Sequence, residues 1–370
     1  MAASAFRPLG FILGGICSVA LGCGGGAIKP DGGGGRDGST PVDGAALPGT
    51  PGGWTWIDVA GMGCDDGSAT GVAVNPAPVS ADGGVLFVYF MGGGACWDAS
   101  TCFVLNTAVH GPFGQAQWDA TGAPALAGPL DRGRATNPFR DASYVFIPYC
   151  TGDLHAGSNV ATYDVLGPRT YAHVGRRNVE ALLPRLRATW PAPARVVISG
   201  SSAGGYGATL NYDLFRRAYP DAQVALVDDA GPLLENDGIP ADERAAWYAN
   251  WHLGDVVDPQ CLDCRGDLSR LYPALTAKYP RDRMALLTSL QDQTIRTYFL
   301  IALGADFEQR LRTMITDRLA PTATFRTFAI PGESHMLLGG LATQISNGVT
   351  LETWLARMGS GDSAWASVGL

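Results

Sequence analysis

Ser202 lies in a sequence pattern that is typical of a serine nucleophile. The pattern Gly200-x-Ser202-x-Gly204 follows residues 195–200, which predict a strand, and precedes residues 206–219, which predict a helix. A serine at such a tight strand-to-helix bend needs neighbours with little side chain, and its hydroxyl lies at a helix N-terminus that favours developing negative charge. Ser201 is the competing serine, but it lies one position off the pattern.

A serine hydroxyl needs a histidine base, and that histidine needs a carboxylate that holds its tautomer. In one common arrangement the chain order is serine, acid, histidine. Of the two histidines after Ser202, we predict that His335 is the base, because it follows the predicted strand 324–330 in a loop. His252 lies within a predicted insertion, where a structural or lid-borne role is the alternative.

The acid should lie between the serine and the histidine, at the end of a strand. Asp292 directly follows the predicted strand 284–290, and we predict that it is the acid. Asp228 and Asp229 also end a strand, but that strand comes early, and we interpret them as turn or pocket-floor residues. Asp306 lies in a helix-like stretch and is less favoured.

Backbone N–H groups must stabilise the oxyanion that forms when the serine attacks. One comes from the residue after the nucleophile, Ala203, and others from a glycine-rich loop after an early strand. We predict that Gly93 and Gly94, which follow the apolar run 85–91, provide them. Each such donor stabilises the transition state by about 3 kcal/mol. A plain glycine turn is the alternative when this loop is taken alone.

The elements that position these residues alternate between strands and helices. Short apolar runs at 85–91, 144–148, 196–199, 224–227, 284–290 and 325–330 predict strands that are buried on both faces. An apolar face at helical spacing covers residues 174–186. This predicts an α/β fold, α/β-hydrolase-like, with a mostly parallel central sheet and helices on both faces. Residues 231–280 lack a clear strand and predict a lid-like insertion.

Composition limits the possible partners. The chain has 370 residues, 46% of them hydrophobic, and a formal net charge of -8. Its acidic balance argues against a nucleic-acid partner, and its apolar content argues against disorder throughout. We expect a single catalytic domain over residues 54–370.

The N-terminal residues predict export. Residues 1–22 combine Arg7 with a short apolar run, as a signal peptide does, and residues 20–23 resemble a bacterial lipoprotein box with Cys23 as the lipidated cysteine. Simple secretion or a retained anchor is the alternative. Residues 23–53 predict a flexible tether, because twelve of the thirty residues 24–53 are Gly and four are Pro. If Cys23 is lipidated, we expect a lipoprotein at the cell surface or outer membrane that contacts the membrane only through this anchor. Otherwise we expect a secreted or periplasmic protein.

The folded part contains six cysteines, namely Cys64, Cys96, Cys102, Cys150, Cys261 and Cys264. An even number in an exported protein predicts disulfides, and six cysteines allow 15 pairings. Short spacing favours Cys96 with Cys102 and Cys261 with Cys264. Half of a zinc site at Cys261-x-x-Cys264 is the alternative, but no second ligand pair at metal spacing accompanies it, and we predict no metal.

The combined motifs resemble those of the pectin acetylesterase family, which includes the Notum-type carboxylesterases. The resemblance covers residues 54–345 and rests on the segments 89–96, 149–153, 200–204, 291–293 and 334–335, together with residues 64–68. It implies an α/β-hydrolase-like fold and cofactor-free ester hydrolysis by Ser202, Asp292 and His335. It also implies the disulfide pairs Cys64–Cys150 and Cys96–Cys102.

Two positions depart from the usual family segment. Met91 stands where the family often has an acid, and Ala95 stands where it often has tryptophan, with Trp97 after the cysteine instead. These differences lie beside the expected acyl pocket, so they bear on the substrate and leave the chemistry intact. The expected function is a serine carboxylesterase that acts through an acyl-enzyme on acyl esters, acetyl above all, of a polysaccharide such as pectin. The alternatives are an exported esterase for polyester or lipid acyl esters, and a non-catalytic surface binding protein.

Overall fold

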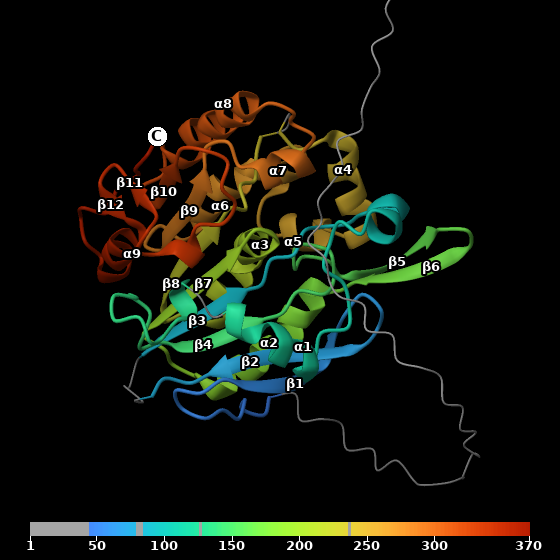
Figure 1. The fold of residues 1–370 in the computed structure, drawn as a ribbon, viewed down its shortest axis with the longest axis horizontal. Helices are drawn as coiled ribbons and strands as arrows, with labels where there is room; N and C mark the ends of the chain where they lie inside the picture. The colour runs from blue at the N-terminus through green and yellow to red at the C-terminus, as the bar shows by residue number, and fades with distance from the viewer. Residues whose placement is uncertain (1–43, 79–83, 126–127, 236–237) are drawn as a thin grey trace, which may run out of the picture. The chain divides into compact units, whose positions relative to one another are not determined.

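The computed structural model describes residues 44–78, 84–125, 128–235 and 238–370. An eight-stranded sheet has the order β1-β2-β4-β3-β7-β8-β9-β10 (Figure 1). The strands are β1 (Thr55–Gly63), β2 (Ala69–Asn75), β3 (Val85–Phe90), β4 (Ser143–Ile147), β7 (Arg195–Ser201), β8 (Gln223–Asp229), β9 (Arg283–Ser289) and β10 (Phe325–Ile330). The six strands from β4 to β10 in this order are parallel, and β2 is antiparallel to both of its neighbours. The six predicted apolar runs correspond to these six parallel strands.

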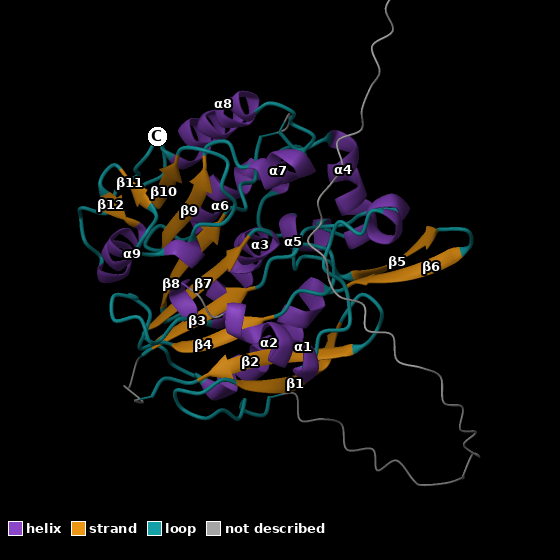
Figure 2. Cartoon of the chain, viewed as in Figure 1, coloured by secondary structure: helices purple, strands orange, loops and turns teal. Residues whose placement is uncertain are grey.

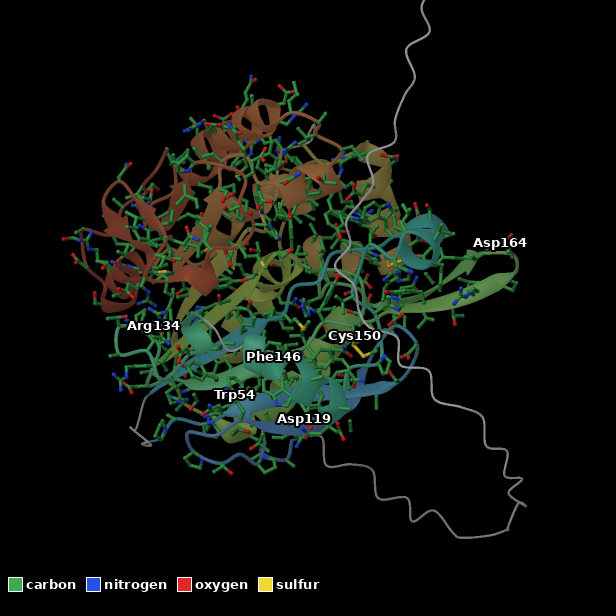
Figure 3. All side chains as sticks on the ribbon, in the orientation of Figure 1. Trp54, Asp119, Arg134, Phe146, Cys150 and Asp164 are labelled. Carbon is green, nitrogen blue, oxygen red and sulfur yellow. A yellow bond between two sulfur atoms is a disulfide. The ribbon has the colours of Figure 1, made fainter. Side chains whose placement is uncertain are left out.

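Helices cover both faces of this sheet (Figure 2). They are α1 (Gln115–Ala125), α2 (Gly175–Thr189), α3 (Ala203–Ala218), α4 (Ala241–Ala246), α5 (Gly254–Val257), α6 (Leu271–Lys278), α7 (Gln293–Tyr298), α8 (Gly304–Met314) and α9 (Leu351–Ser360). Alternate strand residues form two apolar cores: Leu86 and Val88 share one with α2, α3, α6 and α8, and Phe87 shares the other with α1 and α9. Trp54 and Phe146, which Figure 3 labels, belong to the second core. The predicted α/β-hydrolase-like architecture is confirmed.

Two small sheets complete the described secondary structure. The hairpin of β5 (Asn159–Asp164) and β6 (Pro168–His173) projects from the domain, with Asp164 at its far end (Figure 3). The strands β11 (Ile345–Ser346) and β12 (Val349–Thr350) form the other pair. No helix within the described residues is both long and apolar enough to span a membrane.

Three disulfides cross-link the described part of the chain. They join Cys64 to Cys150, Cys96 to Cys102, and Cys261 to Cys264. These are the two pairs that the family resemblance implies and the local pair that spacing favours. Because the sulfurs of Cys261 and Cys264 are bonded to each other, they are not the thiolates that a zinc site requires.

The predicted tether contacts the folded domain. Leu47 is buried, and its N–H donates to the Thr189 hydroxyl at 2.7 Å. The predicted signal peptide, Cys23 and residues 24–43 of the predicted tether lie outside the described residues.

The predicted insertion at 231–280 has two parts. Its C-terminal helix α6 buries Leu271 and Leu275 in the core, as an ordinary crossover helix does. Its N-terminal part, helix α4 followed by the π-helical turn Trp247–Trp251, lies over the carboxyl ends of the strands and lines a cavity there. We call residues 241–251 the wall segment.

Candidate active site

Ser202 occupies a strained bend between β7 and α3. Its backbone has φ 58° and ψ -125°, a left-handed conformation that is rare for a residue with a side chain, and its N–H donates to the Asp229 carbonyl at 2.7 Å. A Cβ on Gly200 would lie 2.2 Å from the Gly204 carbonyl oxygen, and one on Gly204 would lie 2.0 Å from the Phe90 carbonyl oxygen. The two glycines of the pattern are therefore required by close backbone packing, as a nucleophile elbow requires.

The predicted acid and base lie in contact. His335 Nδ1 is 2.8 Å from Asp292 Oδ2, and the other oxygen of Asp292 accepts the Ile295 N–H at 3.0 Å, where it caps α7. Because the carboxylate only accepts hydrogen bonds, Nδ1–H donates and Nε2 carries the lone pair that a general base needs. Asp292 is 1% exposed, so this bond is shielded from water.

The other ring nitrogen of His335 is buried and makes no hydrogen bond within the described residues, to Ser202 or to any other group. In unliganded enzymes the bond between nucleophile and base is often long and tightens only when substrate binds. Ser202 follows β7, Asp292 follows β9 and His335 follows β10, so all three lie at the carboxyl ends of parallel strands.

The loop that carries His335 is anchored on both sides. Toward the acid, the Gln291 N–H donates to the Gly332 carbonyl at 3.0 Å, and Arg296 forms a 2.8 Å ion pair with Glu333. Toward the nucleophile, the N–H groups of Leu337 and Leu338 donate to the Asp229 carboxylate at 2.7 and 3.1 Å. These contacts fix the loop of His335 both to the segment that carries Asp292 and to Asp229.

Asp229 is the positioning residue that the sequence alone did not identify. The Ser201 hydroxyl donates to its carboxylate at 2.7 Å and accepts from the Tyr89 hydroxyl at 3.0 Å. Burial raises the pKa of the Asp229 carboxyl, and the hydrogen bonds from Ser201, Leu337 and Leu338 act in the opposite direction. Asp229 therefore joins the nucleophile bend to the histidine loop, which is more than the turn or pocket-floor role expected of it.

The glycine-rich loop after β3 has the conformation that an oxyanion site needs. Gly94 has φ 76°, and a Cβ on it would lie 2.1 Å from the Thr107 carbonyl oxygen. The N–H groups of Gly93 and Gly94 have no acceptor among the described residues, so both can donate to a ligand. Together with the N–H of Ala203, at the start of α3, they form the candidate oxyanion hole.

His155 contacts the segment that leads into this loop. Its Nε2 lies 2.8 Å from the Met91 carbonyl oxygen, and its ring contacts Phe90 edge-on. Burial lowers the pKa of His155 to about 4, so at neutral pH the ring is uncharged and Nε2–H donates to the carbonyl. The sequence gives no local sign that His155 is a partner of the 92–94 loop.

A small cavity of about 30 Å³ opens beside the nucleophile. Ser202, Ala203 and Gly94 form its catalytic side, and Glu243 and Trp247 from the wall segment form part of its opposite side. Ala95, at the family's usual tryptophan position, also lines it, and Trp97 instead packs edge-on against Trp247 with ring centroids 6.4 Å apart. A larger cavity of about 120 Å³ lies near Arg195 and Arg283, at the amino ends of the strands and away from the triad.

The remaining candidates lie elsewhere. His252 is exposed at the end of the π-helical turn, and Asp306 is exposed in the first turn of α8. Asp228 is buried and accepts from the Thr209 hydroxyl and the Gly231 N–H, which fixes α3 and the turn after β8. Within the described residues, no hydrogen bond or ion pair joins any of these three to His335 or Ser202.

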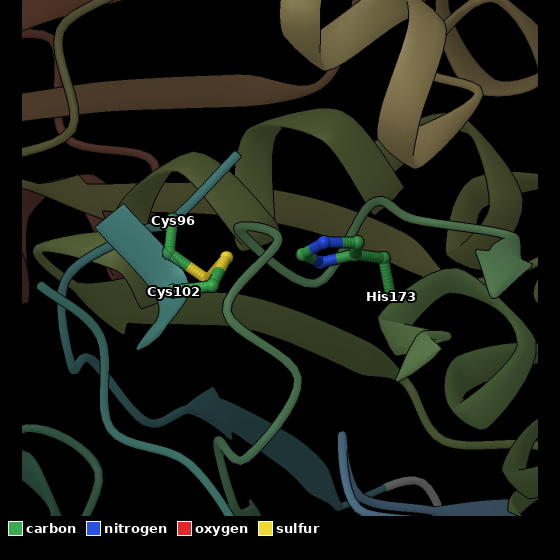
Figure 4. A group of neighbouring side chains, drawn as sticks. All are labelled: Cys96, Cys102 and His173. Carbon is green, nitrogen blue, oxygen red and sulfur yellow. A yellow bond between two sulfur atoms is a disulfide. The ribbon is translucent and has the colours of Figure 1, made fainter. Parts of the chain in front are cut away.

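Cys96, Cys102 and His173 bring three potential metal-ligand atoms within 4.8 Å of one another (Figure 4). The two sulfurs form a disulfide, and the two ring nitrogens of His173 contact the Tyr163 hydroxyl and the Thr151 carbonyl. The disulfide and the hydrogen bonds of His173 therefore account for the proximity of the three residues, which pack next to the β5–β6 hairpin.

Comparisons with known proteins place this geometry in a family. Residues 53–315 match the family model described as Pectinacetylesterase. The palmitoleoyl-protein carboxylesterase NOTUM of Homo sapiens is 28% identical over 180 residues, which are 47% of this chain and 34% of that protein. The protein of the same name from Schmidtea mediterranea is 30% identical over 157 residues, which are 42% of this chain and 28% of that protein. The match thus spans about a third of the length of these relatives.

The fold is also similar to a solved structure. The Wnt deacylase Notum from Drosophila superimposes with a TM-score of 0.60 and 17% sequence identity, over 82% of this chain and 92% of that one. At this identity the similarity concerns the fold, and it agrees with the sheet order and the helical layers described above.

Proposed function

This chain belongs to the pectinacetylesterase family, and we propose that it is a serine carboxylesterase that hydrolyses short acyl esters, acetyl esters of a polysaccharide among them. The observation that carries the proposal is the buried 2.8 Å contact between His335 and Asp292, at the same edge of the sheet as the strained Ser202.

The proposed reaction has two halves. In the first, His335 Nε2 accepts the proton of the Ser202 hydroxyl as its Oγ attacks the ester carbonyl carbon, and the N–H groups of Gly93, Gly94 and Ala203 stabilise the oxyanion. The imidazolium then returns the proton to the departing alkoxide, which leaves as the alcohol. In the second half water attacks the acyl-enzyme by the same route, and the carboxylic acid and free Ser202 are released.

The size of the cavity favours a short acyl group. A single water needs about 10–15 Å³ of cavity space, so a cavity of about 30 Å³ suits a methyl or a similarly small group. A long chain such as the palmitoleoyl group in the names of the relatives does not fit this space. We therefore infer that this chain differs from those relatives in the acyl group it accepts.

The alcohol side is expected to be a neutral carbohydrate. A protein with a net charge of -8 gains no long-range attraction to de-esterified pectin, which is a polyanion. We infer an extracytoplasmic location, which the three disulfides support. Lipidation of Cys23 would hold the enzyme at a membrane surface, and it remains a prediction from the sequence.

The direct test is Ser202→Ala in the purified protein, assayed with a chromogenic acetate ester and with a fluorophosphonate probe. We expect turnover to fall by about 10⁴-fold or more and labelling to disappear, with little change in melting temperature. Ser201→Ala is the matched variant, and it should keep the label. Labelling that persists in Ser202→Ala would refute the assignment.

A substrate panel tests the acyl and alcohol preferences. Acetate release from acetylated xylan and acetylated pectin is compared with hydrolysis of a short polyester and of a palmitoleoyl ester. We expect release from both polysaccharides, with xylan at least as good as pectin. Hydrolysis of the palmitoleoyl ester alone would contradict the inferred acyl size.

A further inference from the structure

The wall segment holds two buried polar groups without partners in the described part of the chain, and the residues that carry them line the cavity beside Ser202. Glu243 is 5% exposed and Trp247 is 2% exposed, and both line the cavity. The Oε1 atom of Glu243 and the Nε1–H of Trp247 are buried and have no hydrogen-bond partner among the described residues. The two residues are four positions apart across α4 and the π-helical turn, a spacing that brings side chains to the same side of a helix.

Buried polar groups without partners destabilise a fold, so such a pair needs an explanation. The rest of the cavity offers none, because its other walls are mainly apolar side chains such as Ile295 and Phe299. No cation among the described residues forms an ion pair with Glu243. Burial, and then the negative charges of Asp242 and Asp98, raise the pKa of Glu243 to about 8. At neutral pH Glu243 is therefore mainly a neutral acid that can both donate and accept.

We propose that the cavity selects a short acyl group that carries a hydroxyl, which binds to Glu243 and Trp247. A hydroxyl has one donor and two acceptor positions, so it can accept from the indole Nε1–H and donate to Oε1 at the same time. A purely hydrocarbon acyl group would leave both protein groups unsatisfied. This inference rests on the proposed function and defines the preferred acyl class of that site.

The cavity belongs to the acyl side of the ester. It is lined by Ser202 and by Gly94 and Ala203 of the candidate oxyanion hole, so the carbon that bears the reacting carbonyl must lie at its mouth. Its volume of about 30 Å³ is too small for a sugar ring, which leaves the alcohol outside it. The substituent on the carbonyl carbon is therefore the part of the substrate that meets Glu243.

The test uses two pairs of chromogenic esters in which CH₃ and OH exchange places with little change in size: propionyl with glycolyl, and butyryl with 3-hydroxypropionyl. The measured quantity is the ratio of kcat/KM for the hydroxylated ester to that for its partner, in the wild type and in Glu243→Leu. Because the intrinsic reactivity of each ester is the same for both enzymes, it cancels when the two ratios are divided. We expect the ratio to fall by about three- to tenfold in Glu243→Leu for at least one pair.

Glu243→Gln and Asp306→Asn complete the set. The amide of glutamine still donates and accepts, so Glu243→Gln should keep most of the preference, whereas Asp306 is exposed in α8 and does not line the cavity, so its variant should leave the ratio unchanged. Equal ratios in the wild type and Glu243→Leu for both pairs would overturn the proposal, and they would indicate that a bound water satisfies the two groups. An enzyme that hydrolyses none of the four esters would overturn the proposed function as well, so the two failures are distinguishable.

Discussion

The edge of the sheet that carries the triad and the wall segment that faces it are built on opposite principles. At the sheet edge, hydrogen bonds connect the segments at the ends of β7, β8, β9 and β10, and the Asp229 carboxylate alone accepts three of them. Across the cavity, Glu243 and Trp247 each leave a buried polar atom without a protein partner. A satisfied network fixes geometry, whereas an unsatisfied pair is available for a ligand. From this contrast we infer that the sheet edge carries out the proposed reaction and that the wall segment selects the acyl group.

The largest effect should follow from the tautomer of His335. In Asp292→Asn the side chain can still accept the Ile295 N–H and cap α7, but its amide no longer holds the imidazole with a lone pair on Nε2. We expect kcat for an acetate ester to fall by about 10⁴-fold.

Asp306→Asn, at an exposed acid in α8, is the control and should retain wild-type activity. A loss of less than tenfold in Asp292→Asn would mean that another carboxylate orients the base, and Asp229 would be the first to examine.

The candidate catalytic residues could be located from the sequence because the signals that mark them are local. The glycines around Ser202 reflect backbone contacts within one bend, and Asp292 and His335 each follow a buried strand whose apolar run is continuous. The six parallel strands were predictable for the same reason. In contrast, β1 and β2 escaped prediction, since β1 mixes buried with exposed residues and contains two glycines.

The roles of Asp229 and Glu243 could not be predicted, because they depend on which distant segments meet. Asp229 contacts Leu337 across 108 positions, and the residues around the end of β8 give no local sign of that partner. Glu243 lies in a helix with acidic neighbours, a pattern that predicts a solvent-exposed helix. Only the fold shows that it lines the cavity beside Ser202. Short-range patterns thus predict the chemistry, and tertiary placement decides its support and its specificity.

A smaller but still large effect is expected at Asp229. Asp229→Ala removes the acceptor of the Leu337 and Leu338 N–H groups and of the Ser201 hydroxyl, which frees the histidine loop from the nucleophile bend. We expect kcat to fall by about 100-fold, as for a displaced catalytic group, while KM changes little. Asp229→Asn keeps one acceptor oxygen and should recover part of the loss.

Asp228→Ala is the matched control for this experiment. It is the adjacent buried carboxyl, but its partners Thr209 and Gly231 hold α3 and the turn and not the base. Both variants should lower the melting temperature, and only Asp229→Ala should lower kcat strongly. Equal losses of kcat in the two variants would show that Asp229 acts through general stability. They would contradict the inference that Asp229 positions the histidine loop.

The smallest effect concerns stability at the wall, and it has a defined sign. The pKa of Glu243 is raised from 4.5 to about 8 in the folded protein, so the folded state holds this proton more tightly than the unfolded chain does. The contribution of Glu243 to stability is fully present below about pH 4.5 and is lost as pH rises through about 8. Glu243→Leu has no such loss, so its advantage over the wild type should grow between pH 5 and 8 and then level off.

Denaturant unfolding of the wild type and Glu243→Leu across this pH range measures the difference directly. Asp306→Asn, at an exposed carboxyl in α8 that does not act on the pKa of Glu243, should show almost no pH-dependent difference from the wild type. A difference that stays constant from pH 5 to 9 would mean that Glu243 titrates as an ordinary solvated carboxyl, which is incompatible with a buried acid facing the cavity. A difference that grows with pH would instead show that ionising the buried Glu243 destabilises the fold, whereas the polar groups at the sheet edge are stabilised by their own hydrogen bonds.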